Sequence, residues 1–390
     1  MNKFQFSIPT DVIFGCGSLN RLSKVGKRIG KKALLVTGKS SMRKTGILDR
    51  VVKLLNEGSV EVVVNEGVDP NPKTNYINDM VTLAKEEKCD FVIGLGGGSS
   101  MDAAKAIALV VANGGIIEDY LPGGERANMR GIKGALPIVA ISTTAGTGSE
   151  VTMFSVITNP ITKEKPGIGH RCLYPKVSIV DPELMVSVPK SITKNTGIDV
   201  LFHAIEAYIS KGATPFTDMY AKEAISLVLN NLHKVLEDGT NIEAREKMAW
   251  ANTLAGIAIT HGGTIGIHGM GHPVSGHTNS AHGATLATLG VAFLEETWDG
   301  HIDRYASLTE LLGFHTSNLS KEEAAAKSSV ALKEVLNNIG ATETLSDLGV
   351  TKDMIDPLVK DTFRTMIGCI KLTLKELNEE DLKRIYEKSL

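Results

Sequence analysis

The chain has 390 residues, of which 42% are hydrophobic and 22% are charged, proportions that are ordinary for a globular protein. Its formal net charge of -2 argues against a protein dedicated to nucleic acid, because no basic excess is present to neutralise phosphates. No apolar run reaches the roughly 18 residues that a membrane-spanning helix needs, so we expect no membrane partner. The length predicts two domains.

The first half of the chain alternates short apolar runs with amphipathic stretches. We predict strands at 32–37, 60–64, 91–95 and 136–142, separated by helices at about 43–56, 75–88 and 100–112. Further strands are expected at 152–158 and 177–180, the first as half of a hairpin that turns at Asn159-Pro160. Strands and helices that alternate at this spacing form βαβ units, which predicts a parallel sheet with helices on its faces.

The β-rich runs stop after Pro182, and the rest of the chain has helical periodicity. Long helices are predicted near 192–210, 216–236, 243–262 and 320–338. We place the domain boundary in the proline-containing stretch 183–190. The predicted fold is therefore an α/β domain with a parallel sheet over 1–185, followed by an all-α domain over 186–390.

The four cysteines are far apart and form no CxxC motif, and the first 15 residues lack the apolar core of a signal peptide. Buried or inert thiols in a reducing compartment are the interpretation that fits. We therefore expect a cytoplasmic protein.

A glycine run follows the strand predicted at 91–95. The chain continues as Gly96-Gly97-Gly98-Ser99-Ser100, and a helix follows from Met101. Glycines let the backbone approach an anion closely, and the N-terminus of the next helix presents free N–H groups and positive dipole. This pattern predicts a pyrophosphate cradle. The alternative is a tight strand-to-helix turn without a ligand.

Two more strand ends carry candidate cofactor contacts. The strand at 136–142 leads into a Thr/Gly loop, 143–148, whose hydroxyls suit a ribose, a pyrophosphate or an amide, or only local backbone bonds. The strand at 32–37 leads into Gly38, Lys39 and Ser40, where an acidic residue commonly holds the adenosine 2′-hydroxyl. Gly38 supplies no carboxylate to repel a 2′-phosphate, so the sequence favours NADP(H), with NAD(H) as the alternative.

The helical half concentrates candidate metal ligands. Asp199 and His203 are four residues apart and therefore share a helix face. His268 lies in another helical stretch, and His282 follows a Gly/Ser/Asn loop. One carboxylate and three imidazoles form a donor set that suits Fe²⁺ or Zn²⁺.

Three further histidines lie in the same region. We interpret His272, four residues after His268, as a neighbour of the metal suited to proton relay, because an imidazole titrates near neutrality. His261 and His277 fit ordinary structural roles.

Together these motifs resemble the iron-containing (group III) alcohol dehydrogenase family over nearly the whole chain. The segments that carry the resemblance are the FGCG at 14–17, GGGSSMDAAK at 96–105, TTAGTGSE at 143–150, DP at 181–182, GIDVLFHAIEAY at 197–208 and HGMGHP…AHG at 268–283. Many members have an aromatic residue where His277 stands, and several have Asp where Gly38 stands.

The resemblance implies a Rossmann-like N-terminal domain, a helical C-terminal domain, and a metal held by Asp199, His203, His268 and His282. It also implies a set of cofactor contacts along the α/β domain. With the strand-end residues above, the predicted contacts are Gly38, Lys39, Ser40, Gly97, Gly98, Ser99, Asp102, Thr143, Thr144, Thr147 and Lys165. All four metal positions are intact, which argues against metal-free relatives and against the three-ligand polyol branch, where zinc is usual.

The expected activity is reversible hydride transfer between NAD(P)(H) and a small primary alcohol, diol or aldehyde. A divalent metal, Fe²⁺ favoured over Zn²⁺, would act as a Lewis acid on the substrate oxygen, and His272 would be the catalytic residue that relays the proton. We expect a homo-oligomer, a dimer or larger, whose partner is a small molecule.

Three other classes of protein are alternatives. A lyase of the dehydroquinate synthase type would share the architecture but needs a dense basic pocket, which residues 190–285 do not offer. A glycerol dehydrogenase-like polyol enzyme is the second. A non-catalytic nucleotide-binding or scaffold protein is the third, but such a protein has no need of the full ligand set.

Overall fold

The computed structural model describes residues 3–129 and 131–390. By their contacts these residues divide into two compact units. Ser7–Val188 form one, hereafter the α/β unit, and Pro189–Leu390 with residues 3–6 form the other, hereafter the helical unit. The sequence predicts a division at 185/186 and places residues 3–6 in the first domain, whereas these contacts place residues 3–6 with the helical unit.

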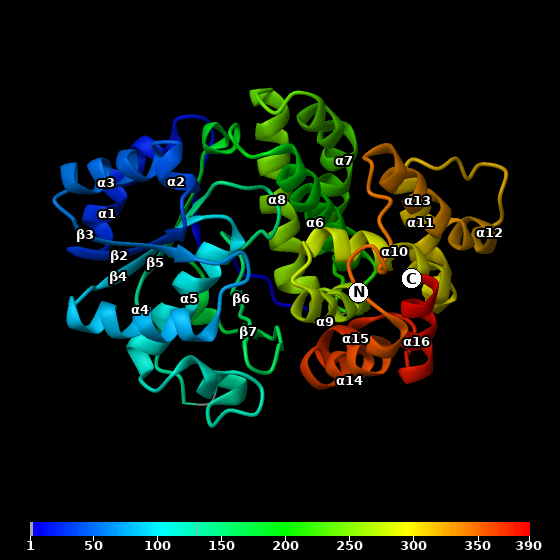
Figure 1. Ribbon diagram of the computed structural model, residues 1–390. Helices are drawn as coiled ribbons and strands as arrows, with labels where there is room; N and C mark the ends of the chain where they lie inside the picture. Colours follow the sequence, from blue (N-terminus) through cyan, green and yellow to red (C-terminus); the bar gives the residue numbers. More distant parts are fainter. Residues whose placement is uncertain (1–2, 130) are drawn as a thin grey trace. The chain divides into compact units, whose positions relative to one another are not determined.

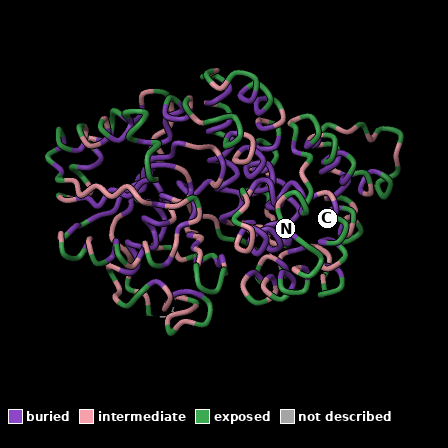
Figure 2. The backbone as a smooth tube through the Cα atoms, viewed as in Figure 1, coloured by how far each residue is buried: buried purple, intermediate pink, exposed green. Residues whose placement is uncertain are grey.

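A parallel sheet forms the centre of the α/β unit (Figure 1). Its strand order is β1-β8-β5-β4-β2-β3, and every neighbouring pair is parallel. The strands are β1 (Asp11–Phe14), β2 (Lys32–Gly38), β3 (Glu61–Val68), β4 (Phe91–Gly96), β5 (Ile138–Ser142) and β8 (Val177–Val180). Every residue of β4, β5 and β8 is buried, whereas most of edge strand β3 is half-buried and pink in Figure 2.

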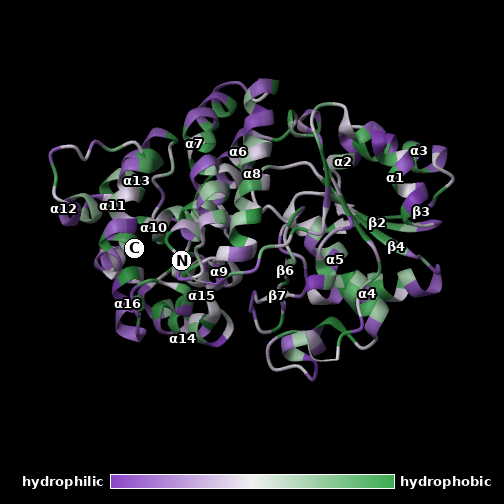
Figure 3. Ribbon diagram, turned by 180° about the vertical axis from the view of Figure 1, so that it is seen from behind, coloured by the Kyte–Doolittle hydropathy of each residue, from purple (hydrophilic) through white to green (hydrophobic). Residues whose placement is uncertain are grey.

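Helices cover both faces of this sheet, which explains why its strands are continuous apolar runs, largely green in Figure 3. Helices α1 (Leu22–Ile29), α2 (Ser41–Lys44) and α3 (Ile47–Glu57) lie on one face, and α4 (Thr74–Glu86) and α5 (Gly98–Asn113) on the other. Successive strand residues point to opposite faces: Leu35 belongs to the hydrophobic cluster under α1 and α3, and Leu34 to that under α4 and α5.

A two-stranded hairpin follows β5. Strands β6 (Phe154–Val156) and β7 (Gly167–Gly169) pair antiparallel. The hairpin predicted around Asn159-Pro160 is therefore confirmed, although its strands are shorter than the predicted 152–158.

Several predicted bounds differ from the structure. Strand β1 was not predicted, because it has only four residues and none of them is fully buried. The helix predicted at 43–56 is two helices, α2 and α3, separated at Gly46, whose φ of 72° lies in the left-handed region. The helix predicted at 100–112 starts earlier, at Gly98, so part of the glycine run is already helical.

The helical unit contains α6 to α16 among the described residues. Their bounds are α6 (Lys190–Tyr208), α7 (Pro215–Glu237), α8 (Ile242–Gly262), α9 (Gly266–Thr278), α10 (His282–Thr297), α11 (Ile302–Leu311), α12 (Lys321–Ala326), α13 (Ser328–Asn338), α14 (Ile355–Thr365), α15 (Ile367–Leu372) and α16 (Glu379–Lys388). The single helix predicted at 320–338 is α12 and α13, which meet at Lys327. None of the described helices combines the length and hydropathy needed to cross a membrane.

Helix α6 is the most enclosed part of the helical unit. From Gly197 to Tyr208 every residue is buried, so this stretch has no solvent-facing side. Two carboxylic acids and one imidazole lie in it, those of Asp199, Glu206 and His203. Buried charges are costly unless they are paired or coordinate a metal. These three side chains therefore need partners in the helical unit.

Candidate functional site

One oxygen of Asp199 faces three imidazoles. The Oδ1 atom lies 3.4 Å from Nε2 of His268, 3.7 Å from Nε2 of His203 and 3.9 Å from Nε2 of His282. Helix α6 supplies Asp199 and His203 from one face, α9 supplies His268 near its start, and His282 is the first residue of α10. The structure thus brings the four predicted metal ligands together from three helices.

These spacings fit the coordination shell of a small divalent ion. Four donors placed tetrahedrally at about 2.1 Å from an ion lie about 3.4 Å from one another. The donor atoms of Asp199, His268 and His282 all lie within 4.8 Å of each other. His203 is not part of that set of three, although its ring stacks on His268 with centroids 4.6 Å apart.

Two of the converging atoms lack hydrogen bonds. Oδ1 of Asp199 and Nε2 of His268 are both buried and have no hydrogen-bond partner. Buried polar atoms without a partner are uncommon and call for an explanation. A cation among the four side chains satisfies both atoms, so the residues present fit a metal ion.

Glu206 is a fully buried residue of α6. It lies in the GIDVLFHAIEAY segment, but the sequence did not predict a role for it. Its Oε1 accepts a hydrogen bond from Nδ1 of His268. Its Oε2 accepts the backbone N–H groups of Ile265, at 2.6 Å, and of His268, at 3.3 Å. The carboxylate therefore caps the N-terminus of α9, where the helix dipole favours an anion, and turns Nε2 of His268 toward Asp199.

The same carboxylate controls the charge of His268. Burial by itself lowers the pKa of this imidazole, but Glu206 and Asp199 outweigh burial and raise the pKa to about 9. A metal ion on Nε2 takes the place of a proton there, as metal binding generally does. A carboxylate behind a ligating histidine is the common way in which proteins fix its tautomer and orientation.

The other predicted histidines lie at different distances from this centre. The ring of His272, also buried, is centred 5.0 Å from that of His282 and 6.2 Å from that of His268. His277 lies at the far end of α9, with Nε2 2.7 Å from Oδ2 of Asp361. His261 packs against Phe6, with ring centroids 4.5 Å apart. The structure therefore places His272 beside the quartet, and gives His261 and His277 packing and ion-pair partners.

The predicted cofactor residues of the α/β unit gather at one edge of its sheet. Gly38, Gly97 and Thr143 stand at the carboxyl ends of β2, β4 and β5, which are neighbours in the sheet. In the sheet, β3 lies on one side of β2, and β4 lies on the other side. The strand order therefore reverses direction between β2 and β4, which makes this position a topological switch point. Open α/β sheets bind their ligands at such points.

The glycine run and the Thr/Gly loop are in contact there. The N–H of Thr143 donates to the carbonyl of Gly96 at 2.9 Å. A Cβ on Gly98 would lie 2.4 Å from Thr147, which leaves no room for a side chain. Helix α5, 16 residues long, begins at this glycine and presents its N-terminal N–H groups to the same place. The arrangement suits a pyrophosphate.

The end of β2 has a feature that the sequence analysis did not predict. Lys39 pairs with Oδ1 of Asp69 at 2.5 Å, and Lys73 pairs with Oδ2 at 3.0 Å. The two lysines lower the pKa of Asp69. Asp69 directly follows β3, the strand beside β2, so sheet order rather than sequence distance reveals it. Ser40 lies exposed next to Lys39.

Three predicted cofactor residues, Ser99, Asp102 and Lys165, lie within the α/β unit, and the first two have hydrogen-bond partners there. The hydroxyl of Ser99 donates to the carbonyl of Pro70. Both carboxylate oxygens of Asp102 are engaged, by Ser149 Oγ at 2.6 Å and by the N–H of Val156 at 2.9 Å. Lys165 is buried. Direct cofactor contact of these three residues stays a prediction, and the bonds of Asp102 indicate a structural contribution.

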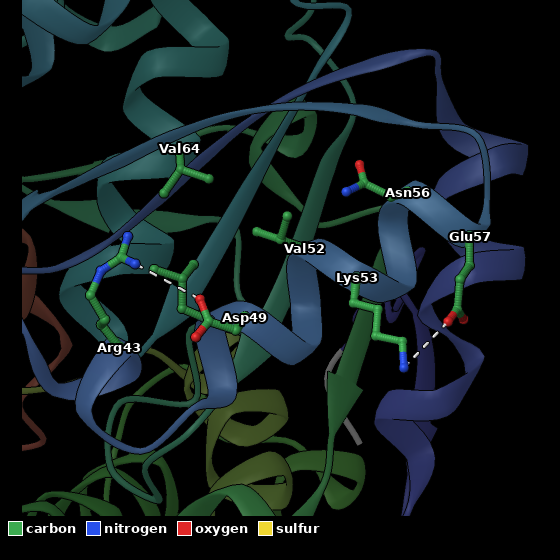
Figure 4. Close-up of a pocket in the computed structure, with 8 residues that line it drawn as sticks. Arg43, Asp49, Val52, Lys53, Asn56, Glu57 and Val64 are labelled. Carbon is green, nitrogen blue, oxygen red and sulfur yellow. Dashed lines mark ion pairs between the residues drawn. The ribbon is translucent and has the colours of Figure 1, made fainter.

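A separate groove opens on the outer side of α3 (Figure 4). Its lining comprises Arg43, Leu48, Asp49, Val52, Lys53, Asn56, Glu57 and Val64. The ion pairs among its lining residues are long, 3.8 Å for Arg43–Asp49 and 3.9 Å for Lys53–Glu57, and the second pair lies along α3. None of these described lining residues carries an imidazole, thiol or hydroxyl, and none is among the predicted site residues.

Comparison with known proteins identifies the family of this chain. The family model described as "Iron-containing alcohol dehydrogenase" matches residues 9–182, and that described as "Fe-containing alcohol dehydrogenase family, C-terminal" matches residues 193–390. The NAD-dependent methanol dehydrogenase of Bacillus methanolicus is 36% identical over 389 residues, 99% of each chain. The NADPH-dependent butanol dehydrogenase of Clostridium saccharobutylicum is 32% identical over 386 residues, 98% of this chain and 97% of the relative.

A solved structure shows the same fold over the whole chain. The archaeal halo-thermophilic alcohol dehydrogenase ADH/D1 from a Red Sea brine pool is 38% identical, covers 100% of both chains and gives a TM-score of 0.96. These likenesses define the class as oxidoreductases that act on alcohols with a nicotinamide cofactor. The chain belongs to the iron-containing alcohol dehydrogenase family, which confirms the resemblance, the fold and the enzyme class predicted from the sequence.

Proposed function

We propose that this chain interconverts small primary alcohols or diols and their aldehydes, with one divalent ion held by Asp199, His203, His268 and His282. The observation that carries the proposal is the single oxygen of Asp199 facing three imidazole Nε2 atoms at 3.4 to 3.9 Å. Fe²⁺ is favoured and Zn²⁺ is the alternative, since the donor types suit both. When bound, such an ion supplies a Lewis acid that polarises the oxygen of the substrate.

The chain's own residues prepare this chemistry in each unit. In the helical unit, Glu206 fixes the orientation of His268, and burial of Asp199, His203 and His268 keeps bulk water from their donor atoms. In the α/β unit, the N-terminus of α5 and the Thr/Gly loop hold the dinucleotide, whose reduced ring supplies the hydride. The named relatives act on methanol and butanol, which supports short, unbranched substrates.

A substrate panel tests the proposal. Metal-free protein is reloaded with Fe²⁺ or with Zn²⁺ and mixed with NADPH or NADH and one aldehyde at a time, from formaldehyde to butanal and including 3-hydroxypropanal. We expect the absorbance at 340 nm to fall with at least one short aldehyde and the matching alcohol to appear. Oxidation of neither cofactor by any aldehyde, with the metal bound, would overturn the proposal.

His272 is proposed as the proton relay of this reaction. Its buried ring lies beside the quartet, 5.0 Å from the ring of His282, which is the most exposed of the four predicted ligands. We expect His272→Ala to lower kcat by about 10²-fold, the lower end of general acid–base contributions, while the metal content stays at one ion per chain. Added imidazole should restore part of the rate. A wild-type kcat in His272→Ala would show that the relay is wrong.

NADP(H) is proposed as the favoured cofactor, with NAD(H) as the alternative. Gly38 places no carboxylate at the end of β2, and Asp69 nearby is flanked by two lysines, so the local charge favours a 2′-phosphate. The relatives include both an NAD-dependent and an NADPH-dependent enzyme, so family membership leaves the choice open.

Gly38→Asp tests this choice. A Cβ on Gly38 meets no atom closer than 3.9 Å, so the backbone accepts a side chain. The new carboxylate repels a 2′-phosphate, and we expect the ratio of kcat/KM for NADPH to that for NADH to fall about tenfold or more, or ~1.4 kcal/mol. Gly38→Ala adds the Cβ without the charge and serves as the control. A wild-type preference for NADH by tenfold would contradict the proposal before any substitution.

The lyase alternative has a distinct signature. A dehydroquinate synthase-like enzyme uses its nicotinamide transiently, so absorbance at 340 nm returns to its starting value after each turnover.

Two further proposals concern the assembly and location of the chain: that it forms a homo-oligomer, and that it resides in the cytoplasm. The latter is supported by Cys16, Cys89, Cys172 and Cys369, which form no disulfide among the described residues.

A further inference from the structure

Lys105 is a lysine with no exposed surface, in the middle of the α/β unit. Its Nζ donates to Ser149 Oγ at 2.7 Å, to Thr152 Oγ1 at 3.2 Å and to the carbonyl of Phe154 at 2.8 Å. A buried ammonium is costly unless its hydrogen bonds are satisfied, and here all three donors have acceptors. Every acceptor belongs to one segment, residues 149–156, which leads from the Thr/Gly loop into β6.

Asp102, three residues earlier on α5, binds the same segment. It accepts from Ser149 Oγ at 2.6 Å and from the N–H of Val156 at 2.9 Å, and its own carbonyl accepts from Ser155 Oγ at 2.8 Å. Burial raises the pKa of Asp102 and lowers that of Lys105 to about 8, and the charge of each opposes the shift of the other. The two side chains therefore form one unit, joined through Ser149.

Lys105 and Asp102 join two segments that lie next to predicted cofactor residues. Helix α5 begins at Gly98, inside the glycine run, and segment 149–156 begins two residues after Thr147. The two loops already touch, because a Cβ on Gly98 would lie 2.4 Å from Thr147. The glycine run and the Thr/Gly loop are therefore packed in direct contact. Hydrogen bonds that fix α5 against 149–156 also fix the distance between the N–H groups at the start of α5 and the hydroxyls of the Thr/Gly loop.

We propose that Lys105, together with Asp102, is a positioning residue for the dinucleotide. It holds the start of α5 and the Thr/Gly loop at the spacing that a pyrophosphate requires, without touching the cofactor. This inference rests on the proposed use of a nicotinamide dinucleotide. It assigns the lysine and the aspartate of the GGGSSMDAAK segment to the geometry of the cradle rather than to contact with the ligand.

The test compares two ligands that differ in the pyrophosphate. Calorimetry on the full chain gives dissociation constants for ADP and for adenosine. Lys105→Met keeps the length of the side chain and removes its donors, and we expect ADP to bind about tenfold or more weakly, since small misplacements of positioning groups have effects of this size. The constant for adenosine should change by less than about threefold. In steady-state rates, KM for the cofactor should rise more than kcat falls.

Milder variants keep the inference testable if Lys105→Met does not fold. Ser149→Ala removes the hydroxyl shared by Lys105 and Asp102, and should weaken ADP in the same direction. Thr82→Ala removes a hydroxyl of α4 that bonds the carbonyl of Asn78 within the same helix, and should leave ADP binding within about twofold of wild type. Plasma mass spectrometry should find the wild-type metal content in all three.

The outcomes separate the inference from the proposed function. If folded Lys105→Met or Ser149→Ala binds ADP as tightly as wild type, the positioning role is wrong and the proposed function stands. Equal losses for ADP and adenosine also overturn it, because they indicate general loosening of the unit. If wild-type protein binds neither ADP nor NAD(P)H at millimolar concentration, the proposed function fails and the inference fails with it.

Discussion

Asp199→Asn is expected to purify with less than about a tenth of the wild-type metal and to lower kcat/KM by about 10³-fold or more. The magnitude follows because a Lewis acid contributes several kcal/mol and each 1.4 kcal/mol is tenfold in rate. Its Oδ1 is the one atom that faces His203, His268 and His282. The amide keeps the shape of the side chain but removes the charge, so the loss reports coordination rather than packing.

Plasma mass spectrometry and steady-state rates measure this effect. Asp356→Asn is a matched control, because that side chain is 66% exposed and lies on the helical unit away from the quartet. Wild-type metal content and rate in Asp199→Asn would refute the ligand assignment.

Glu206→Gln is expected to weaken metal binding by about 10- to 100-fold, the usual effect of removing the partner behind a ligating histidine. The carboxylate accepts three donors, and an amide presents an N–H₂ group toward at least one of them. A buried donor left without its acceptor also costs about 1–3 kcal/mol, so the metal-free variant should unfold at lower denaturant than the wild type.

Chelator competition gives the metal dissociation constant of this variant, and urea unfolding gives its stability. Glu223→Gln, an exposed glutamate on α7, is the matched control. The assigned role of Glu206 does not survive if both the dissociation constant and the unfolding midpoint equal those of wild type.

The sequence was informative where function follows a short-range pattern. The i, i+4 spacing of Asp199 and His203 predicts a shared helix face, and the structure places both beside His268 and His282. Alternating apolar runs predicted the parallel sheet, because buried strands between helices must be apolar on both faces.

What the sequence did not reveal depends on contacts between distant segments. Glu206 lies in an apolar helical stretch, and a charged residue enclosed there was a signal that a buried partner exists. The partner, at α9, is set by how the helices pack. Asp69 and Lys39 are 30 positions apart and meet because β2 and β3 are neighbours in the sheet. Lys105 appears in the sequence only as part of the GGGSSMDAAK segment, and its complete burial depends on how α5 packs in the α/β unit.

One metal ion on the quartet is proposed to support net hydride transfer to an aldehyde. The most direct test is a titration of metal-free protein with Fe²⁺, under exclusion of oxygen, in which NADPH consumption at 340 nm and alcohol formation are measured at each step. We predict that activity rises linearly, stops rising at one equivalent per chain, and yields one alcohol for each NADPH. Full activity without metal, or turnover without net loss of absorbance at 340 nm, would contradict the account.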